Sequence, residues 1–278
     1  MRILILGSIG QLGTPLTERL LKEGHRVITP THEELDLKRA EYVRAYIQFQ
    51  RPEVLLNCAA IHDVSKCEQS PDLAIAINVG AVVAMHGACE EIGAKFFQVS
   101  TDYVVDVPGL VLEGDDINPH SQLSSIYART KRAAEKLCTG RDTVVRVSTL
   151  YGHDPCRGKS RPNLVDQLHT KLSVGEELEM PMDIGCSPGY CVDVAEVLSR
   201  MISVTTPNIV HLAPRGLDGN YTLRDFAQDV SNVYGNYTEV KGKSSSNSSG
   251  VINLGTQYNW SLPNVVDSLR KYLEVKCG

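Results

Sequence analysis

Tyr127 and Lys131 stand four residues apart in the stretch IYARTK, within a predicted helix over 125–138. Residues at this spacing project from one face of a helix. A tyrosine can donate a proton to a carbonyl oxygen while hydride reaches the carbon, and a nearby ammonium lowers its pKa from a reference value of about 10. The same ammonium can bind the ribose of a nicotinamide nucleotide. A packing tyrosine one turn from a surface lysine is the alternative interpretation.

Thr101 supports the chemical interpretation of this pair. It follows a predicted strand over 94–100, and open α/β sheets build their sites at the carboxyl ends of strands. Its hydroxyl can hold the carbonyl group of a substrate. Thr101, Tyr127 and Lys131 are therefore the predicted catalytic residues.

A glycine-rich turn follows the first predicted strand. Gly7, Gly10 and Gly13 in GSIGQLG lie between a strand over 2–7 and a helix over 15–24. Such a turn lets the backbone approach a pyrophosphate, and the helix N-terminus offers free N–H groups to the phosphates. A tight strand-to-helix turn without a ligand is the alternative. The position at the first strand of an α/β pattern favours dinucleotide binding.

The end of the second predicted strand, 26–29, bears on cofactor preference. An acidic residue there would bind the ribose 2′-hydroxyl of NAD, and its absence favours NADP(H). Glu33 and Glu34 follow closely, so NAD(H) stays open. Asp36 and Leu37 are placed either to contact the adenine or to begin the next helix.

The elements around these residues alternate between strand and helix. Strands are predicted at 2–7, 26–29, 53–60, 94–100, 143–148 and 207–214. Helices are predicted at 15–24, 40–50, 71–93, 125–138, 222–235 and 262–274. The alternation predicts an α/β fold of Rossmann type, with a doubly wound parallel sheet.

After residue 150 this rhythm becomes irregular. We therefore expect an NAD(P)-binding Rossmann domain over 1–150 and a smaller, mainly substrate-binding α/β domain over 151–278, with about 190–214 returning to the Rossmann sheet. Polar loops are expected at 151–163 and at KGKSSSNSSG, 241–250.

Composition limits the classes of function. The net charge of −5 argues against general nucleic-acid binding. The apolar run in MRILILG is too short for a signal peptide or a membrane span, so we expect a soluble, cytoplasmic protein without a membrane partner. The eight cysteines lack zinc-site spacing, which favours free thiols and no metal, with Cys186 and Cys191 the closest pair.

The order of motifs identifies a family resemblance. GSIGQLG, NCAA, KCEQSP, INVGAV, VSTDYVV, YARTK and RVSTLYG follow one another as in the extended short-chain dehydrogenase/reductases. In detail the chain resembles the dTDP-4-dehydrorhamnose reductase family, whose hallmark is Ser-Thr-Asp-Tyr-Val. The resemblance covers nearly the whole chain and is strongest over 1–152. It implies NAD(P)H-dependent reduction of the 4-keto group of dTDP-6-deoxy-L-lyxo-4-hexulose, which gives dTDP-L-rhamnose.

The resemblance also implies roles for individual residues. Thr101, Tyr127 and Lys131 would form the catalytic triad, and Asn78 would stabilise nearby active-site loops. The expected cofactor-binding residues are Gly7, Ile9, Gly10, Gln11, Leu12, Gly13, Asp36, Leu37, Ala59, Ala60, Asn78, Tyr127 and Lys131. The expected substrate-binding residues are Thr101, Asp102, Tyr103, Tyr151 and Asn163. The partner is a nucleotide sugar, and a homodimer is possible.

Some segments depart from the family pattern. Ala128 replaces the glycine that usually follows the catalytic tyrosine, and 61–68 differs from the usual sequence after NCAA. SSSNSSG lacks the arginine that holds the nucleotide end in the family, which leaves the sugar nucleotide open. A basic loop could supply that charge or could simply be solvated. Its cations are Arg157, Lys159 and Arg161.

Two other functions fit the same branch of proteins. A regulatory subunit similar to the beta subunit of methionine adenosyltransferase would bind NADP without catalysing a reaction, but the complete triad favours an enzyme. A nucleotide-sugar epimerase or dehydratase would recycle its cofactor. Dehydratases usually carry Asp-Glu after the catalytic threonine, and the pair Asp102-Tyr103 counts against that activity.

Overall fold

Six parallel strands form the central sheet of the structure, a computed structural model that describes residues 1–115, 123–152, 162–235, 239–245 and 250–277. The strand order is β10-β6-β4-β3-β1-β2. Their bounds are β1 Arg2–Leu6, β2 Arg26–Ile28, β3 Val54–Asn57, β4 Lys95–Thr101, β6 Thr143–Val147 and β10 Ile209–His211. This sheet confirms the predicted α/β class of Rossmann type.

The strand order reverses at β1, which lies between β2 and β3. In open α/β sheets a ligand binds outside the carboxyl ends of the strands at such a switch point. The segments that leave β1 and β3 there are the glycine turn, which begins at Gly7, and the stretch that begins at Cys58. The topology therefore predicts a ligand-binding site at this edge of the sheet.

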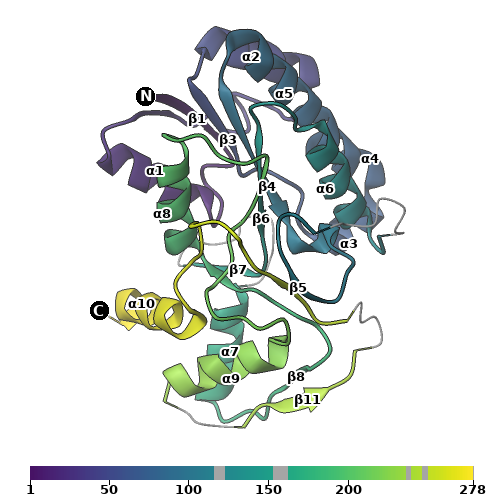
Figure 1. Cartoon of the computed structure of the whole chain (residues 1–278), viewed down its shortest axis with the longest axis vertical. Coiled ribbons are helices and arrows are strands. Elements are labelled where there is room, and N and C mark those ends of the chain that lie inside the picture. The colour runs from purple at the N-terminus through teal and green to yellow at the C-terminus, as the bar shows by residue number, and fades with distance from the viewer. Residues whose placement is uncertain (116–122, 153–161, 236–238, 246–249, 278) are drawn as a thin grey trace.

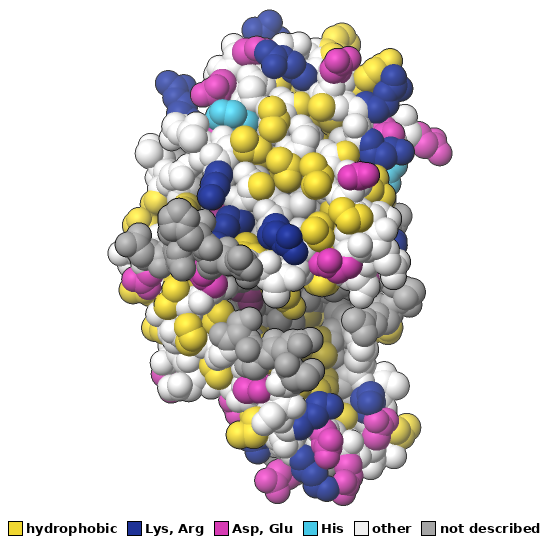
Figure 2. Space-filling view, turned by 90° about the vertical axis from the view of Figure 1, so that its right-hand side faces the viewer, with side chains coloured by type: hydrophobic (Ala, Val, Ile, Leu, Met, Phe, Trp, Pro, Cys, Tyr) yellow, Lys and Arg dark blue, Asp and Glu magenta, His cyan; other side chains and the backbone are white. Residues whose placement is uncertain are grey.

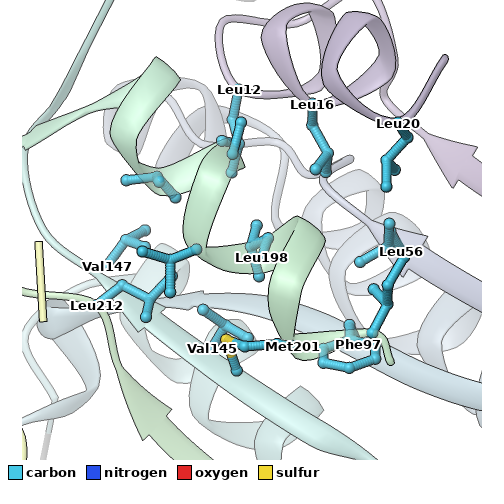
Figure 3. Packing of buried hydrophobic residues seen from close by; sticks show 14 of the residues in the cluster. Leu12, Leu16, Leu20, Leu56, Phe97, Val145, Val147, Leu198, Met201 and Leu212 are labelled. Atoms are coloured by element: carbon cyan, nitrogen blue, oxygen red, sulfur yellow. The ribbon is translucent and has the colours of Figure 1, made fainter. Parts of the chain in front are cut away.

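Helices α1 (Gly13–Lys22) and α8 (Cys191–Met201) cover one face of the sheet. Figure 3 shows leucines of α1 and Leu198 and Met201 of α8 packing toward strand residues such as Val145 and Phe97. These side chains belong to one buried cluster. Burial of such apolar surface stabilises the layer by about 25 cal/mol per Å². The helix α8 was not predicted from the sequence, although it belongs to the stretch 190–214 and β10 follows it at the sheet edge.

The opposite face is covered by α2 (Ala40–Gln50), α5 (Ala81–Ile92) and α6 (Ile126–Leu137) (Figure 1). The predicted helix 71–93 is in fact three consecutive pieces. They are α4 Pro71–Ile75, a π-helical turn η1 Ala76–Gly80, and α5. A π turn commonly marks a functional position, and η1 contains Asn78.

The stretch Pro71–Ile92 is the one helical segment in the described ranges that is long and apolar enough to cross a membrane, judged by length and composition. Its apolar content has a structural explanation, because α5 contributes a row of small and apolar side chains to the buried cluster on the sheet. Leu73, Ile75 and Val83 remain exposed. Figure 2, which views the side of the molecule with α4 and α6, shows hydrophobic side chains gathered on its upper half.

A second layer lies below the sheet in Figure 1 and has its own core. Its helices are α7 Leu164–Ser173, α9 Leu223–Val233 and α10 Val265–Cys277. They surround buried aromatic residues that include Tyr151, Tyr190, Phe226 and Tyr272. Helix α7 was not predicted.

Short parallel strand pairs complete this layer and its junction with the sheet. They are β8 Glu179–Pro181 with β11 Lys241–Lys243, β5 Gly109–Val111 with β12 Ile252–Leu254, and β7 Leu150–Tyr151 with β9 Gly189–Tyr190. The strand β11 corrects the expectation that 241–250 is loop throughout, because pairing with β8 satisfies its backbone. Residues 246–249 lie outside the described ranges.

Candidate active site

The glycine turn is packed as tightly as the sequence predicts. Gly7 has a φ of 77°, and a Cβ there would lie 2.8 Å from the Ala59 nitrogen at the end of β3. A Cβ at Gly13 would lie 2.0 Å from the Gly7 oxygen, and the Gly10 N–H donates to that oxygen at 3.0 Å. Only glycine fits this arrangement without a backbone shift. The turn brings the start of α1 against the stretch after β3.

The side chains of the turn divide into core and candidate ligand-binding residues. Leu12 is buried beneath the turn, whereas Ile9 is exposed. The Gln11 amide nitrogen is buried and has no hydrogen-bond partner in the described part of the chain. A buried donor without a partner is costly, and an oxygen-rich ligand such as a pyrophosphate would satisfy it. The residues present therefore fit a dinucleotide phosphate.

Ala59 and Ala60 lie at the carboxyl end of β3, where they were predicted to contact cofactor. The Asn57 Oδ1 accepts a hydrogen bond from the Ala59 N–H at 3.1 Å, and the Asn57 amide donates to Gln98 Oε1 at 2.8 Å. Both amide side chains are buried. This pair fixes the stretch after β3, and sequence reasoning missed it because Asn57 and Gln98 meet only through strand pairing.

Asp36 does not cap the next helix, because α2 begins at Ala40 with Arg39 as its N-cap residue. Leu37 is buried in the core under α2. The Asp36 Oδ1 accepts from the Lys38 N–H at 3.0 Å, and Asp36 pairs with the Lys38 ammonium at 3.3 Å. The backbone hydrogen bond to Lys38 is the main reason that the pKa of Asp36 is lowered.

Thr101 ends β4 and lies beside the predicted tyrosine. Its hydroxyl donates to Asp102 Oδ1 at 3.0 Å and accepts from the Tyr103 N–H at 3.3 Å. It also lies close enough to the Tyr127 phenol to influence the pKa of that group. The helix α6 that carries Tyr127 begins at Ser125, whose side chain caps the Ala128 N–H at 3.1 Å. The structure thus brings Thr101 and Tyr127 into direct contact.

Lys131 lies one turn beyond Tyr127 and is buried. Its ammonium donates to the Val99 carbonyl at 2.6 Å, on β4. Burial lowers the pKa of Lys131 to about 8, and the Glu135 carboxylate opposes that shift. The ammonium also acts electrostatically on Cys58, next to the glycine turn. Lys131 therefore connects the catalytic strand with the cofactor edge.

The pKa of Tyr127 is raised, whereas a neighbouring ammonium was expected to lower it. Burial raises the pKa of Tyr127, and the nearby Thr101 hydroxyl offsets only part of that rise. The Lys131 ammonium is directed to a backbone carbonyl and is not among the groups that shift the phenol. Desolvation exceeds the electrostatic effect that the spacing predicted.

Asp102 and Tyr103 form the short helical turn η2 (Asp102–Val104) next to Tyr127. The Tyr103 ring packs edge-on against the Tyr127 ring, with centroids 5.8 Å apart. The Asp102 carboxylate accepts a short hydrogen bond from Ser148, which follows β6. Ser148 was not identified from the sequence.

Asn78 hydrogen-bonds to the stretch after β3 and to α6. Its Oδ1 accepts from the Ile61 N–H at 2.9 Å, and its amide donates to the Ile61 carbonyl at 3.0 Å and to Thr130 Oγ1 at 3.2 Å. The Thr130 hydroxyl donates to the Tyr127 carbonyl at 2.8 Å. Asn78 thus ties the stretch after β3 to α6, and its amide atoms are occupied by protein groups.

Two further contacts, which were not predicted from the sequence, connect α6 with neighbouring segments. Glu68 accepts a hydrogen bond from the Ile126 N–H at 2.6 Å, at the start of α6. Arg132 donates to the Val104 carbonyl and pairs with Asp106 at 3.3 Å. Both contacts join segments far apart in sequence, so no local pattern indicates them.

Tyr151 and Asn163 lie apart from this group in the second layer. Tyr151 is fully buried, and its ring stacks on Tyr190 with centroids 5.6 Å apart. Asn163 caps α7 by accepting from the Asp166 N–H at 3.1 Å, and its amide donates to the Gly152 carbonyl at 2.8 Å. These positions give both side chains structural roles. Arg157, Lys159 and Arg161 lie outside the described residues.

Metal and disulfide chemistry has no support within the described ranges. No group of three or more His, Cys, Asp or Glu side chains there could hold a metal ion. Cys186 and Cys191 are buried, and no disulfide joins them.

Comparison with known proteins gives consistent matches over most of the chain. The family model described as RmlD substrate binding domain matches residues 1–250. The spore coat polysaccharide biosynthesis protein SpsK of Bacillus subtilis is 30% identical over 84% of this chain and 80% of its own length. A dTDP-4-dehydrorhamnose reductase of Streptomyces griseus is 31% identical over 78% of this chain and 69% of its own length.

Solved structures match over nearly the full length. A dTDP-4-dehydrorhamnose reductase of Clostridium acetobutylicum has a TM-score of 0.84 at 26% identity, with all of both chains covered. The dTDP-4-dehydrorhamnose reductase of Bacillus anthracis, solved in complex with NADP, has a TM-score of 0.82 at 25% identity, with 99% of both chains covered.

Proposed function

Because the chain belongs to the family of the RmlD substrate binding domain, we propose that it is an NADPH-dependent oxidoreductase that reduces the 4-keto group of a nucleotide-linked 6-deoxyhexose. The product class would be that of dTDP-L-rhamnose or a related deoxysugar. Several reductases with this activity in their names are similar to the chain over most of its length. NADH is the alternative reductant.

One observation carries this proposal. The phenol of Tyr127 lies beside the Thr101 hydroxyl at the carboxyl end of β4, and the buried Lys131 lies one helical turn away. The electrostatic effect of Lys131 on Cys58, which adjoins the glycine turn, supports a location of this group near the switch point. A proton donor next to a dinucleotide-shaped turn is what carbonyl reduction requires.

In the proposed reaction the reduced nicotinamide supplies the hydride when it is bound. The backbone around Gly7 and Gly13 and the Gln11 amide would hold its pyrophosphate. Tyr127 would donate its phenolic proton to the keto oxygen, and Thr101 would orient that phenol. Lys131, held by the Val99 carbonyl, would bind the ribose and stabilise the negative charge that develops on the phenol.

The proposed substrate-binding residues lie in the short helical turn η2. Asp102 and Tyr103 border the proton donor, and the Tyr103 side chain is exposed. We propose that Asp102 and Tyr103 contact the sugar. Tyr151 and Asn163 are not included, because their side chains pack and hydrogen-bond within the second layer. The proposal also divides the chain into two domains at about residue 150. It further includes a homodimer, a cytoplasmic location, and no nucleic-acid or membrane partner.

The test is a substrate panel. The purified protein is mixed with dTDP- and UDP-linked 4-keto-6-deoxyhexoses and with NADPH or NADH, and nicotinamide absorbance is followed. We expect turnover with a dTDP-linked sugar and faster oxidation of NADPH than of NADH. Tight NADP binding without turnover on any keto sugar would contradict the proposal and indicate a regulatory subunit.

A further inference from the structure

The Val99 carbonyl of β4 is the point at which the proposed catalytic lysine meets a second buried side chain. It accepts a hydrogen bond from the Lys131 ammonium at 2.6 Å and another from the Gln98 Nε2 at 2.7 Å. A carbonyl oxygen has two lone pairs, so it can hold both donors at once. Because Lys131 and Gln98 are both buried, water does not replace either donor, and the carbonyl fixes the ammonium relative to the amide.

The other end of the Gln98 side chain leads toward the glycine turn. Its Oε1 accepts from the Asn57 Nδ2 at 2.8 Å, and the Asn57 Oδ1 accepts from the Ala59 N–H at 3.1 Å. The Ala59 nitrogen lies 2.8 Å from the place that a Cβ on Gly7 would occupy. These hydrogen bonds form an amide series that joins the lysine to the turn. Its members are Lys131 Nζ, Val99 O, the Gln98 and Asn57 amides, and Ala59 N–H.

The amide series has one possible direction. The Val99 carbonyl at one end only accepts and the Ala59 N–H at the other end only donates, so each side-chain amide must turn its NH2 to one neighbour and its oxygen to the other. Rotation of either amide by half a turn would set two donors or two acceptors against each other, which is costly inside a protein. Asn57 and Gln98 are each 1% exposed and are Cα partners on β3 and β4. The series is therefore held in a single arrangement.

The placement of Lys131 depends on this carbonyl rather than on an ion pair. An ammonium has three N–H donors, and the Val99 carbonyl is the one hydrogen-bond acceptor that Lys131 reaches in the described part of the chain. The nearest acid along α6, Glu135, forms its ion pair with Arg146 at 2.7 Å. Two donors of the ammonium therefore remain for the nicotinamide ribose and for the phenolate of the proposed reaction.

We propose that Gln98 and Asn57 are positioning residues that couple occupation of the glycine turn by the dinucleotide to the placement of the Lys131 ammonium. The inference rests on the proposed function, because its ligand is the nicotinamide dinucleotide of that reaction. A pyrophosphate bound on the turn fixes the backbone after β3, and the amide series transmits this constraint to the lysine. Both amides act through Lys131 rather than on the reacting atoms, and they hold it ready for the ribose before the keto sugar binds.

The first test needs no turnover. Its probe is 2′-phosphoadenosine 5′-diphosphate, the part of NADP that carries the adenine and both bridging phosphates but lacks the ribose that would touch Lys131. Carbon-13 NMR of lysine labelled at Cε should show a shift of the Lys131 signal when this probe saturates native protein. Gln98→Met removes both amide hydrogen bonds at a similar side-chain length, and we expect it to remove most of that shift. The charge of the probe acts on Lys131 in both proteins, so an equal shift in both, or no shift in native protein, would overturn the coupling.

The second test is a double-mutant cycle of Gln98→Met and Lys131→Met on the Kd for NADPH, measured by nicotinamide fluorescence without keto sugar. Because Gln98 acts through Lys131, Gln98→Met should weaken binding by roughly 10-fold in native protein and by less than about twofold in the Lys131→Met background. A buried amide with only a structural role would weaken binding by the same factor in both backgrounds. Equal factors would therefore overturn the proposal.

Thr143→Val is the matched control. Thr143 is buried on β6, its hydroxyl hydrogen-bonds to that of Thr206 at 2.6 Å, and neither residue belongs to the amide series. We expect the shift caused by the probe and the Kd for NADPH to stay within about twofold of native values in this variant.

Two further outcomes separate the inference from the proposed function. If Gln98→Met does not fold, the side-chain amide signals of Gln98 in native protein decide the point. They should move when the probe binds, and unmoved signals would overturn the coupling. Coupling without turnover on any keto sugar would refute the proposed function and leave the coupling established.

Discussion

Tyr127 and Tyr151 lie in different regions of the molecule, Tyr127 half-buried and Tyr151 fully buried, and desolvation raises the pKa of both phenols. The Tyr127 phenol lies beside the Thr101 hydroxyl, which donates to Asp102, and one helical turn from the buried Lys131 ammonium. The Tyr151 ring is packed among aromatic rings of the second layer, and its hydroxyl forms no hydrogen bond of normal geometry within the described ranges, although Ser268 and Asp193 are near.

The difference shows that burial alone does not give a tyrosine a chemical role. A phenol can exchange a proton only where a neighbour accepts or returns it and where the ionised form is stabilised. The region of Tyr127 has such neighbours on β4 and α6, while the region of Tyr151 has mainly apolar and aromatic ones. Chemistry is therefore expected from the first region and stability from the second.

Among the variants that test this difference between the two regions, Lys131→Met is expected to have the largest effect. Removal of the ammonium should lower kcat by about 100-fold or more, because the charge beside the reacting phenol is lost. The same change should stabilise the cofactor-free protein at neutral pH. Burial lowers the pKa of Lys131 from 10.5 to about 8, so a charged Lys131 costs on the order of 3 kcal/mol in the native state.

The sign of that stability effect depends on pH. Below pH 8 the lysine is charged in both native and unfolded states, and the native state bears the full cost. Above about pH 10.5 it is neutral in both states and the cost disappears. Urea denaturation at several pH values should therefore show a gain in the free energy of unfolding for Lys131→Met that shrinks as pH rises. A variant less stable at pH 7 than at pH 10, relative to native protein, would contradict this account.

A smaller effect, on stability only, is expected from Asn163→Ala. This change removes the cap of α7 and the hydrogen bond to the Gly152 carbonyl. We expect a loss of about 1 to 2 kcal/mol in the free energy of unfolding and a KM for the keto sugar within about twofold of the native value. A large rise in KM with unchanged stability would show that Asn163 contacts substrate after all.

The smallest effect is expected from Tyr151→Phe. Because the buried hydroxyl is poorly hydrogen-bonded, its removal should change the free energy of unfolding by less than about 1 kcal/mol. Steady-state kinetics should stay within about twofold of native values. A strong loss of kcat in this variant would contradict the claim that Tyr151 has only a structural role.

The sequence predicted those parts of the site that depend on local patterns. The glycine turn between a strand and a helix and the i, i+4 spacing of Tyr127 and Lys131 are both visible within about ten residues. Thr101 was found because it ends a continuous apolar strand. The six strands of the sheet were predicted for the same reason, since buried parallel strands are apolar throughout.

Contacts between distant strands could not be predicted in this way. Thr101 pairs with Val147 across β4 and β6, so the next residues along, Asp102 and Ser148, meet beyond the ends of the two strands. That register is set by packing of the whole sheet rather than by local sequence. The π-helical turn at Asn78 was also missed, and Asn78 within it hydrogen-bonds to the distant Ile61.

Single-turnover reduction by Tyr127→Phe tests the account most directly. Enzyme saturated with NADPH is mixed with the dTDP-linked 4-keto-6-deoxyhexose, and loss of nicotinamide absorbance is followed by stopped flow, with Tyr151→Phe as the matched control. We predict that Tyr127→Phe is slower than native protein by roughly 100-fold or more at an unchanged Kd for NADPH, and that the control is as fast as native protein. Equal rates for Tyr127→Phe and native protein would contradict the assignment of the proton donor.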